Sequence, residues 1–229
     1  MVEDALSPKS LISAFATPVV AHAWPSSESL NRELSEEILA LERRSAGIVR
    51  SNVRGWHSDE TFFESTSRSM QTVKERIRQM TALMTIAVSA PTTPSRSCDC
   101  KSSGWANVSR SGDYNGVHNH PGWAWSGVYY VSSGTRDPDD ELNGRLELLD
   151  PRGSVAVMAS PAETLLNARF LVTPLPGLMV LFPSWLHHMV HPFIGRGERI
   201  SIAFNVNTTD ASTRAPTRRS DVASRMDAA

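Results

Sequence analysis

Hydrophobic and polar positions follow one period in the first hundred residues and a different period after Gly104. Apolar residues three and four positions apart predict a helix that begins at Ser26 or Ser27 and ends at Gly47, and a second helix over about 65–88. Their apolar stripes are Leu30, Leu34, Ile38 and Leu41 in the first helix, and Met70, Val73, Ile77, Met80 and Met84 in the second. Before them, the β-branched stretch 10–24 predicts an edge strand because Pro18 interrupts it.

After Gly104, short β-type runs alternate with Gly, Pro, Asn and Asp. Eight or nine short strands at this spacing are typical of a sandwich or barrel, against which the preceding helices are expected to pack on one outer face. The predicted strands are Trp105–Ser109, Gly116–His120, Trp125–Val131, Arg145–Leu149, Ser154–Val157, Arg169–Val172, Leu178–Phe182, His188–Pro192 and Arg199–Val206. We therefore expect three parts, namely a strand and helical layer over 1–104, a β core over 105–207, and a disordered tail over 208–229.

Composition narrows the possible functions. The chain has 229 residues, 40% of them hydrophobic, and a formal charge of −1. Because no net positive charge would attract nucleic acid or anionic lipid, a nucleic-acid or membrane partner is disfavoured. No apolar run reaches the ~18–20 residues of a membrane span. A small soluble domain, monomeric or homodimeric, is the expectation.

The cellular location is expected to be the cytoplasm. The chain starts Met-Val-Glu-Asp, without the basic region of a secretory signal. Its two cysteines, Cys98 and Cys100, are separated by one residue, which disfavours a disulfide between them, and two thiols alone do not form a zinc site. We interpret them as reduced loop thiols.

Two clusters contain five of the seven histidines. In the first, His118 and His120 lie two residues apart on a predicted strand, so their side chains should share one face. Two imidazoles placed side by side can chelate one cation, and imidazole suits Fe, Zn, Cu and Ni. The second cluster, His187, His188 and His191, follows a predicted strand about seventy residues later. A sheet closed on itself would bring the two clusters together and supply a third ligand.

The strand after the second cluster has a clean two-residue alternation. Arg199, Ser201, Ala203 and Asn205 share one face, and Ile200, Ile202 and Phe204 share the other. A polar strand face normally contacts water. An arginine and a serine two residues apart can, however, also hold a carboxylate, because guanidinium binds it as a fork and the hydroxyl adds one hydrogen bond.

Together these features resemble the iron(II)- and 2-oxoglutarate-dependent oxygenases, whose fold is a double-stranded β-helix, or jelly roll. Several strings between residues 55 and 205 are similar to one small, mostly bacterial family with a His-x-His-Pro motif. The strings are Gly55-Trp-His-Ser58, His118-Asn-His120-Pro121, Ser126-Gly-Val-Tyr-Tyr130, Asp150-Pro-Arg152, Phe182-Pro-Ser-Trp-Leu-His-His188 and Arg199-Ile-Ser-Ile-Ala-Phe-Asn205.

The resemblance implies a mainly β, cupin-like jelly roll with N-terminal helices packed on one outer face. It also implies iron(II), 2-oxoglutarate and O2 as cofactor and co-substrates, and hydroxylation of an amino-acid, peptidyl or small-molecule substrate. By the same resemblance, His118 and His188 are metal ligands, Arg199 holds the far carboxylate of 2-oxoglutarate, and Ser201 assists it. His187 and His191 would then face the other way and pack or form hydrogen bonds.

One position departs from the wider superfamily, which has Asp or Glu where this chain has His120. His120 could complete a neutral three-histidine site, which we favour, or lie behind a two-histidine iron site, or the metal could be other than iron. Loss of a carboxylate should weaken metal binding. Asp113 or Asp150 could replace it only if the fold placed one of them nearby.

Further site residues are predicted with less support from the pattern. Tyr130 and Asn205 are candidates for binding 2-oxoglutarate, and Trp123 and Arg152 for binding substrate, although Arg152 could instead pair with Asp150 in a turn. Asn107 could also point inward. Trp123, Trp125 and Trp185 are expected to form pocket walls, whereas Trp56 and Trp105 are expected in the core.

Two other functions fit parts of the pattern. A cupin-like three-histidine enzyme would bind metal without using Arg199, Ser201 or 2-oxoglutarate. A non-catalytic β-sandwich binding module would use the histidines structurally and bind no metal.

Overall fold

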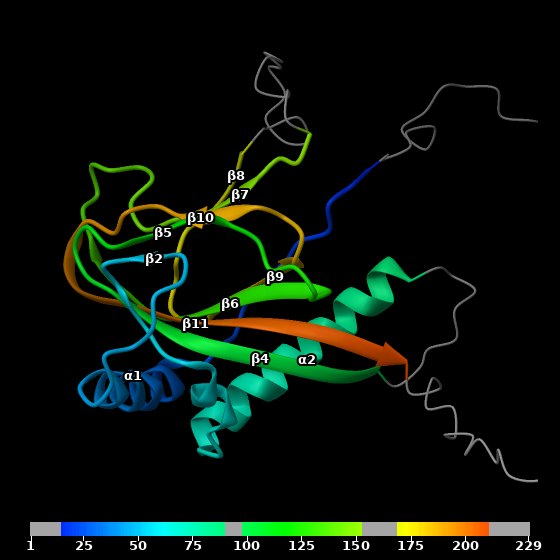
Figure 1. Ribbon diagram of the computed structural model, residues 1–229, viewed down its shortest axis with the longest axis horizontal. Helices are drawn as coiled ribbons and strands as arrows, with labels where there is room; N and C mark the ends of the chain where they lie inside the picture. Colours follow the sequence, from blue (N-terminus) through cyan, green and yellow to red (C-terminus); the bar gives the residue numbers. More distant parts are fainter. Residues whose placement is uncertain (1–14, 90–97, 153–168, 211–229) are drawn as a thin grey trace, which may run out of the picture.

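Two antiparallel β-sheets face each other in the computed structural model, which describes residues 15–89, 98–152 and 169–210 (Figure 1). The larger sheet has the strand order β1 (Val20–Ala23), β9 (Leu178–Pro183), β6 (Trp125–Arg136), β11 (Gly195–Asp210), β4 (Cys98–Ser109) and β3 (Trp56–His57). The smaller sheet has the order β2 (Asn52–Val53), β5 (Tyr114–His118), β10 (His188–Val190), β7 (Leu146–Leu149) and β8 (Arg169–Val172).

From β4 to β7 successive strands alternate between the two sheets, and from β8 to β11 they alternate again. This winding makes the β core a double-stranded β-helix, and the predicted jelly roll is confirmed. Most strand pairs within each sheet, such as β4 with β11 and β5 with β10, join segments far apart in sequence. The interior between the sheets therefore collects side chains from the whole length of the core.

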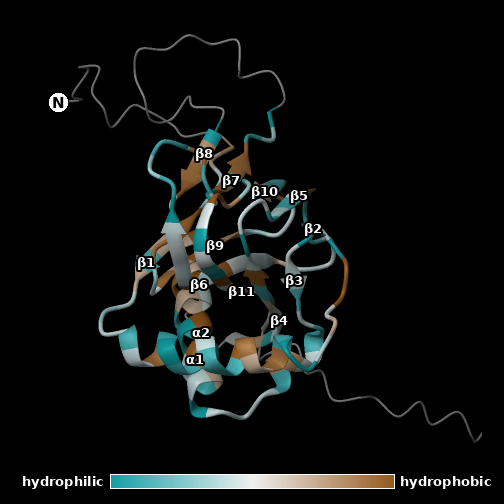
Figure 2. Cartoon of the chain, turned by 90° about the vertical axis from the view of Figure 1, so that its left-hand side faces the viewer, coloured by the Kyte–Doolittle hydropathy of each residue, from teal (hydrophilic) through white to brown (hydrophobic). Residues whose placement is uncertain are grey.

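The helices lie on the outer face of the larger sheet (Figure 2). They are α1 (Glu28–Glu42) and α2 (Arg68–Val88), with the short 3₁₀ helix η2 (Glu60–Glu64) between them. The hydroxyl oxygen of Ser67 accepts a hydrogen bond from the backbone N–H of Met70 and so caps the first turn of α2. None of the described helices is long and apolar enough to cross a membrane.

The predicted apolar stripes form the core between the helices and the sheet. Leu34 and Ile38 of α1 and Met70, Val73, Ile77, Met80 and Met84 of α2 are buried there. The sheet contributes Ile200, Ile202 and Phe204 of β11 to the same core. Because this face of β11 packs on the helices, Arg199 and Ser201 on its other face must point between the two sheets.

Several elements differ in length from the prediction. The pair β4 and β11 is longer, since twelve residues from Arg199 to Asp210 pair with Ser109 to Cys98. The added residues are mostly polar, so the hydrophobic pattern does not predict them as strand. Backbone hydrogen bonds between the two strands nevertheless continue through them. The predicted strand Ser154–Val157 and residues 211–229 of the predicted tail lie outside the described residues.

Candidate metal centre

His118 and His188 lie opposite each other on neighbouring strands of the smaller sheet. Their Cα atoms are direct partners between β5 and β10, and the centroids of their rings are 4.3 Å apart. Seventy residues of chain separate them, but the winding of the sheets makes β10 the neighbour of β5. The predicted meeting of the two histidine clusters therefore takes place between these two strands.

A β-bulge in β5 sets the direction of His118. The strand pairs His188 with His118 and Val190 with Asn115, so the two residues of β5 between these pairs oppose the single residue Met189 of β10. The extra residue lets both Asn115 and His118 line the pocket, while Val117 between them is 55% exposed. Strict alternation would have placed Asn115 and His118 on opposite faces.

His120 reaches the same place from the irregular segment that follows β5. We expected it on the strand with His118, but β5 ends at His118, and the backbone N–H of His120 bonds to the carbonyl of Ser184. Its ring centroid is 5.0 Å from that of His118 and 5.2 Å from that of His188. One nitrogen from each of the three rings lies within 4.8 Å of the others. Among the described residues this is the one cluster of His, Cys, Asp or Glu that could hold a metal ion.

Hydrogen bonds and burial leave these imidazoles ready to bind a cation. Nδ1 of His118 is 2.7 Å from the carbonyl oxygen of Gly116, and Nδ1 of His188 is 2.9 Å from that of Leu186. Since Nδ1–H donates to these carbonyls, each Nε2 carries a lone pair and no hydrogen, the usual arrangement in metal-binding histidines.

Burial also lowers the pKa of all three histidines. Burial, together with the nearby His118, lowers the pKa of His188 to about 3 and that of His120 to about 4. The pKa of His118 is lowered in the same direction, mainly by burial. The three rings are therefore neutral at pH 7, as metal ligation requires.

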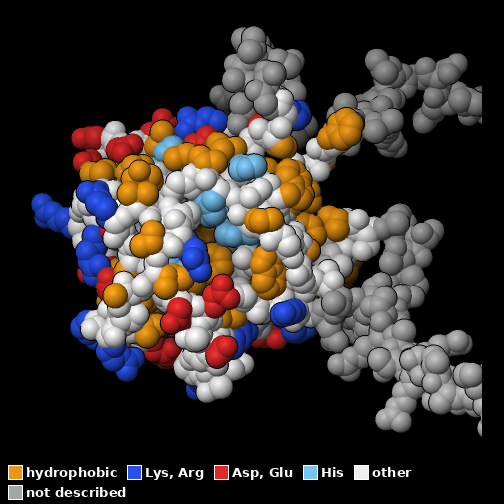
Figure 3. Space-filling model, in the orientation of Figure 1, with side chains coloured by type: hydrophobic (Ala, Val, Ile, Leu, Met, Phe, Trp, Pro, Cys, Tyr) orange, Lys and Arg blue, Asp and Glu red, His pale blue; other side chains and the backbone are white. Residues whose placement is uncertain are grey.

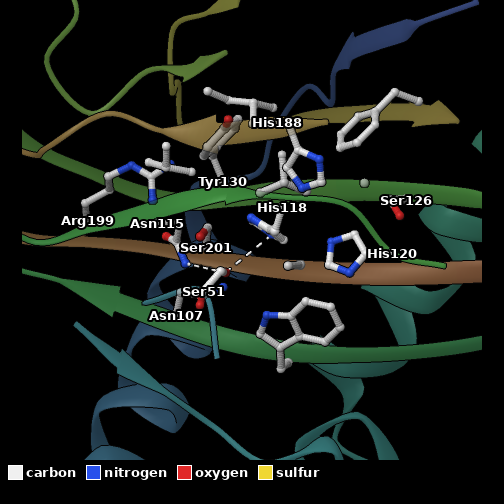
Figure 4. Close-up of a pocket in the computed structure, with 17 residues that line it drawn as sticks. Ser51, Asn107, Asn115, His118, His120, Ser126, Tyr130, His188, Arg199 and Ser201 are labelled. Atoms are coloured by element: carbon white, nitrogen blue, oxygen red, sulfur yellow. Dashed lines mark hydrogen bonds between the residues drawn. The ribbon is translucent and has the colours of Figure 1, made fainter. Parts of the chain in front are cut away.

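Arg199 lies in the same pocket, at the other end from the histidines (Figure 4). Its side chain is only 2% exposed, and its Nε–H donates to the carbonyl of Gly144. No carboxylate of the described residues forms an ion pair with it. Burial lowers the pKa of Arg199, but a guanidinium keeps its charge at neutral pH, so this is a buried cation that lacks an anion.

Polar groups beside Arg199 also lack partners. Ser201 of β11 is paired in register with Asn107 of β4 on one side and with Tyr130 of β6 on the other, and all three line the pocket. The Tyr130 hydroxyl and the Asn107 Oδ1 are buried and have no hydrogen-bond partner. Burial raises the pKa of Tyr130 to about 12, so its hydroxyl is a neutral donor. An anion bound at Arg199 would satisfy these groups.

Some predicted site residues lie elsewhere. Asn205 does not line the pocket, and its Oδ1 accepts a hydrogen bond from Ser126. Trp123 is also absent from the pocket lining. Arg152 is exposed and pairs with Asp150 in a turn, with Nε 2.9 Å from Oδ1, so Asp150 does not join the histidines. The roles of Asn205, Trp123 and Arg152 stay predictions.

The structure also places the other histidines of the two clusters and the candidate ligand Asp113. His187 is exposed, and His191 lies 2.6 Å from a carboxylate oxygen of Glu147 on the outer side of the smaller sheet. Asp113 accepts a hydrogen bond from the backbone of Arg110 and is not part of the metal cluster. The expectation that His187 and His191 face away from the site agrees with these contacts.

Trp105, which we expected in the core, is a wall of the pocket. It lies between His57, on which it stacks at 5.3 Å, and His120 at 5.6 Å. Trp125 instead packs against the helix-facing core, and Trp185 is 52% exposed. The local sequence does not show which of these tryptophans line the pocket, because each lies in a similar apolar run.

Ser51 and Asn115 were not predicted as site residues at all. Both line the pocket, and Ser51 Oγ is 3.4 Å from Nε2 of His118. In the space-filling view, histidine side chains reach the surface of this face between hydrophobic side chains (Figure 3). The pocket therefore opens to solvent beside the histidines, while Arg199 closes its inner end.

The donor set fits an iron(II) ion and a dicarboxylic keto acid. Three neutral imidazoles are suitable ligands for a divalent transition metal. The buried guanidinium without an anion and the unpartnered Tyr130 hydroxyl suit the carboxylate at the far end of such an acid.

Comparisons with known proteins agree with this geometry. Residues 103–205 match the model of a family described as "Putative 2OG-Fe(II) oxygenase". No protein with a curated description is similar enough in sequence to match the chain. Solved structures with a similar fold include three that are each less than 20% identical to it.

Three of these structures are representative. A prolyl-4-hydroxylase from Pseudomonas putida is 17% identical, with a TM-score of 0.55 over 82% of this chain and 91% of that one. A prolyl hydroxylase from Trichoplax adhaerens, in complex with a hypoxia inducible factor peptide, is 14% identical, with a TM-score of 0.53 over 82% of each chain. HygX from Streptomyces hygroscopicus, with nickel and 2-oxoglutarate bound, is 15% identical, with a TM-score of 0.53 over 83% of each chain.

Proposed function

We propose that the chain, whose residues 103–205 match the 2OG-Fe(II) oxygenase family, couples oxidative decarboxylation of 2-oxoglutarate to hydroxylation of an organic substrate. In this reaction 2-oxoglutarate, O2 and a C–H bond give succinate, CO2 and an alcohol. The observation that carries the proposal is one pocket with three neutral histidines at its mouth and an unpaired, buried arginine at its inner end.

In this proposal His118, His120 and His188 hold iron(II). The bound metal supplies the activation of O2 that the side chains cannot supply. The neutral rings contribute no negative charge, in contrast to a site with a carboxylate ligand. The hydrogen bonds from Nδ1 to the carbonyls of Gly116 and Leu186 keep two rings oriented.

Arg199, Ser201 and Tyr130 bind the far carboxylate of 2-oxoglutarate. Arg199 provides the countercharge, and the fixed carbonyl of Gly144 orients its guanidinium through Nε. Tyr130 donates its hydroxyl hydrogen, which it keeps because burial raises the pKa to about 12. Asn107, in register with Ser201, offers a further polar contact in the same row.

The reacting part of the substrate is uncharged. Arg199 is the only residue with a fixed charge in the described lining of the pocket. In this proposal its charge is neutralised by the carboxylate of the keto acid. The rest of the lining is polar but neutral, or apolar, with Trp105, Phe182 and Val190 among the apolar members. A peptidyl side chain or a neutral part of a small molecule would fit these walls. Structures of similar fold with a peptide fragment bound and with hygromycin B bound are compatible with either class.

Anaerobic addition of iron(II) and then 2-oxoglutarate tests the proposal. We expect a visible charge-transfer band that depends on both additions and is lost in Arg199→Ala. Metal binding without any response to 2-oxoglutarate would instead support a cupin-like three-histidine enzyme. No metal binding would support a non-catalytic module.

A further inference from the structure

Ser51 brings a hydroxyl group to the pocket from outside the segment that matches the family, residues 103–205. It immediately precedes β2, the edge strand that pairs with β5, and its carbonyl accepts a hydrogen bond of 2.9 Å from the Gly116 N–H. This contact fixes the backbone of Ser51 at the bulge that directs His118. Its hydroxyl oxygen then lies 3.4 Å from Nε2 of His118 (Figure 4).

The donors and acceptors around Ser51 follow one order, from Asn115 to Ser51 to His118. Nδ2 of Asn115 donates to the Ser51 hydroxyl oxygen at 3.3 Å. Nδ1–H of His118 donates to the Gly116 carbonyl, so Nε2 has a lone pair and no hydrogen. The hydroxyl hydrogen of Ser51 therefore points to Nε2. Asn115, Ser51 and His118 form a relay in which each group donates to the next.

Metal binding must break the last step of this relay. The lone pair of Nε2 cannot bind a cation and accept a hydrogen bond at the same time. Asn115 still occupies the oxygen of Ser51, and β2 still holds its backbone, so the hydroxyl hydrogen needs another acceptor in the pocket. The described lining of the pocket contains no Asp or Glu that could accept it.

The anion that enters this space in the proposed reaction is the keto acid. We propose that Ser51, oriented by Asn115, donates its hydroxyl hydrogen to the carboxylate of 2-oxoglutarate next to His118 and so positions the keto acid at the metal. This inference rests on the proposed function, and it makes Ser51 a contribution of the N-terminal layer to the site. A hydrogen bond to a charged group changes a binding constant by about 10- to 100-fold.

Cobalt(II), which can be handled in air, is the probe for the test. The dissociation constants of Co(II), and of 2-oxoglutarate for the Co(II)-loaded protein, are measured by titration calorimetry for the wild type, Ser51→Ala, Ser51→Thr and Asn115→Ala. Ser111→Ala is the matched control, because Ser111 is an exposed loop serine outside the pocket lining. Thermal unfolding of each variant shows that it is folded.

We expect Ser51→Ala to bind Co(II) within about twofold of the wild type but 2-oxoglutarate about tenfold more weakly. Ser51→Thr keeps the hydroxyl and should restore most of the affinity. Asn115→Ala frees the hydroxyl to rotate, so its effect should be smaller and should not add to that of Ser51→Ala in the double variant.

Two results would overturn the inference while leaving the proposed function intact. One is unchanged affinity of Ser51→Ala for 2-oxoglutarate. The other is equal weakening of Co(II) and 2-oxoglutarate binding, which would mean that Ser51 only supports the His118 ring. A wild-type protein that binds no Co(II), or no 2-oxoglutarate when loaded, would overturn both proposals.

Discussion

His118 and His188 are direct partners across β5 and β10, with ring centroids 4.3 Å apart, although seventy residues separate them along the chain. The smaller sheet thus holds two imidazoles at a fixed separation by backbone hydrogen bonds rather than by side-chain contacts. The third imidazole, from His120, lies on the irregular segment that follows β5. This difference in support leads to separate predictions for His188 and His120.

His188→Ala should weaken Co(II) binding at least about 100-fold, since loss of even an outer hydrogen-bond partner of a metal ligand costs about 10- to 100-fold. His187→Ala is the matched control, because this neighbouring histidine is exposed and outside the pocket lining. It should bind as the wild type does. Equal affinity of the two variants, measured by calorimetry, would exclude His188 as a ligand.

The role of His120 can be tested by counting ligands. If His120 binds the metal, the Co(II) protein should show three shifted imidazole N–H resonances in its proton NMR spectrum and His120→Ala only two. His120→Asp should bind Co(II) more tightly than the wild type, because a carboxylate adds a negative charge to an otherwise neutral ligand set. Two resonances in the wild type would place His120 behind the metal site.

Arg199→Met should abolish measurable binding of 2-oxoglutarate while leaving the fold intact. Methionine has a similar length and needs no countercharge, so removal of the unpaired buried cation should leave the melting temperature equal or higher. Arg196→Met on the same strand is the control, since Arg196 is exposed and outside the pocket lining. Retention of 2-oxoglutarate affinity in Arg199→Met would contradict the assignment of the carboxylate site.

Glu147 should make stability depend on pH. Hydrogen bonds from Arg169, and then from His191, lower the pKa of this buried carboxyl below its usual 4.5. Its stabilising effect is thus complete above the unfolded pKa and disappears as pH falls through the lower folded pKa. Glu147→Gln should lose about 1–3 kcal/mol of unfolding free energy at pH 7. The difference from wild type should shrink in urea denaturation below about pH 4.5; a constant difference down to pH 2 would disprove the linkage.

The sequence predicts the features that depend on periodicity. Arg199 and Ser201 share a face because the period of a strand is two residues, and Leu34 and Met70 lie in the core because helical stripes must be buried. The convergence of His118 and His188 was predicted from the histidine clusters and the resemblance to a family. These signals are local or depend on residue type, so one sequence is enough to detect them.

Features that depend on tertiary hydrogen bonds were not predicted. The bulge between Asn115 and His118 changes the parity of β5, and no residue type signals where the extra residue lies. Ser51 joins the site because its carbonyl pairs with Gly116, a contact between chain segments 65 residues apart. Trp105 has the same apolar character in a core as in a pocket wall, so its place is known only from the fold.

The bulge in β5 limits how this chain can vary in length. Asn115 and His118 both point inward only because one surplus residue lies between them, so deletion of Val117 would turn one of the two side chains out to solvent. The segment after His120 is a turn with no such parity. Insertions in this turn can therefore change the pocket entrance. The spacing from Asn115 to His118, in contrast, must stay constant in any variant that keeps both side chains in the pocket.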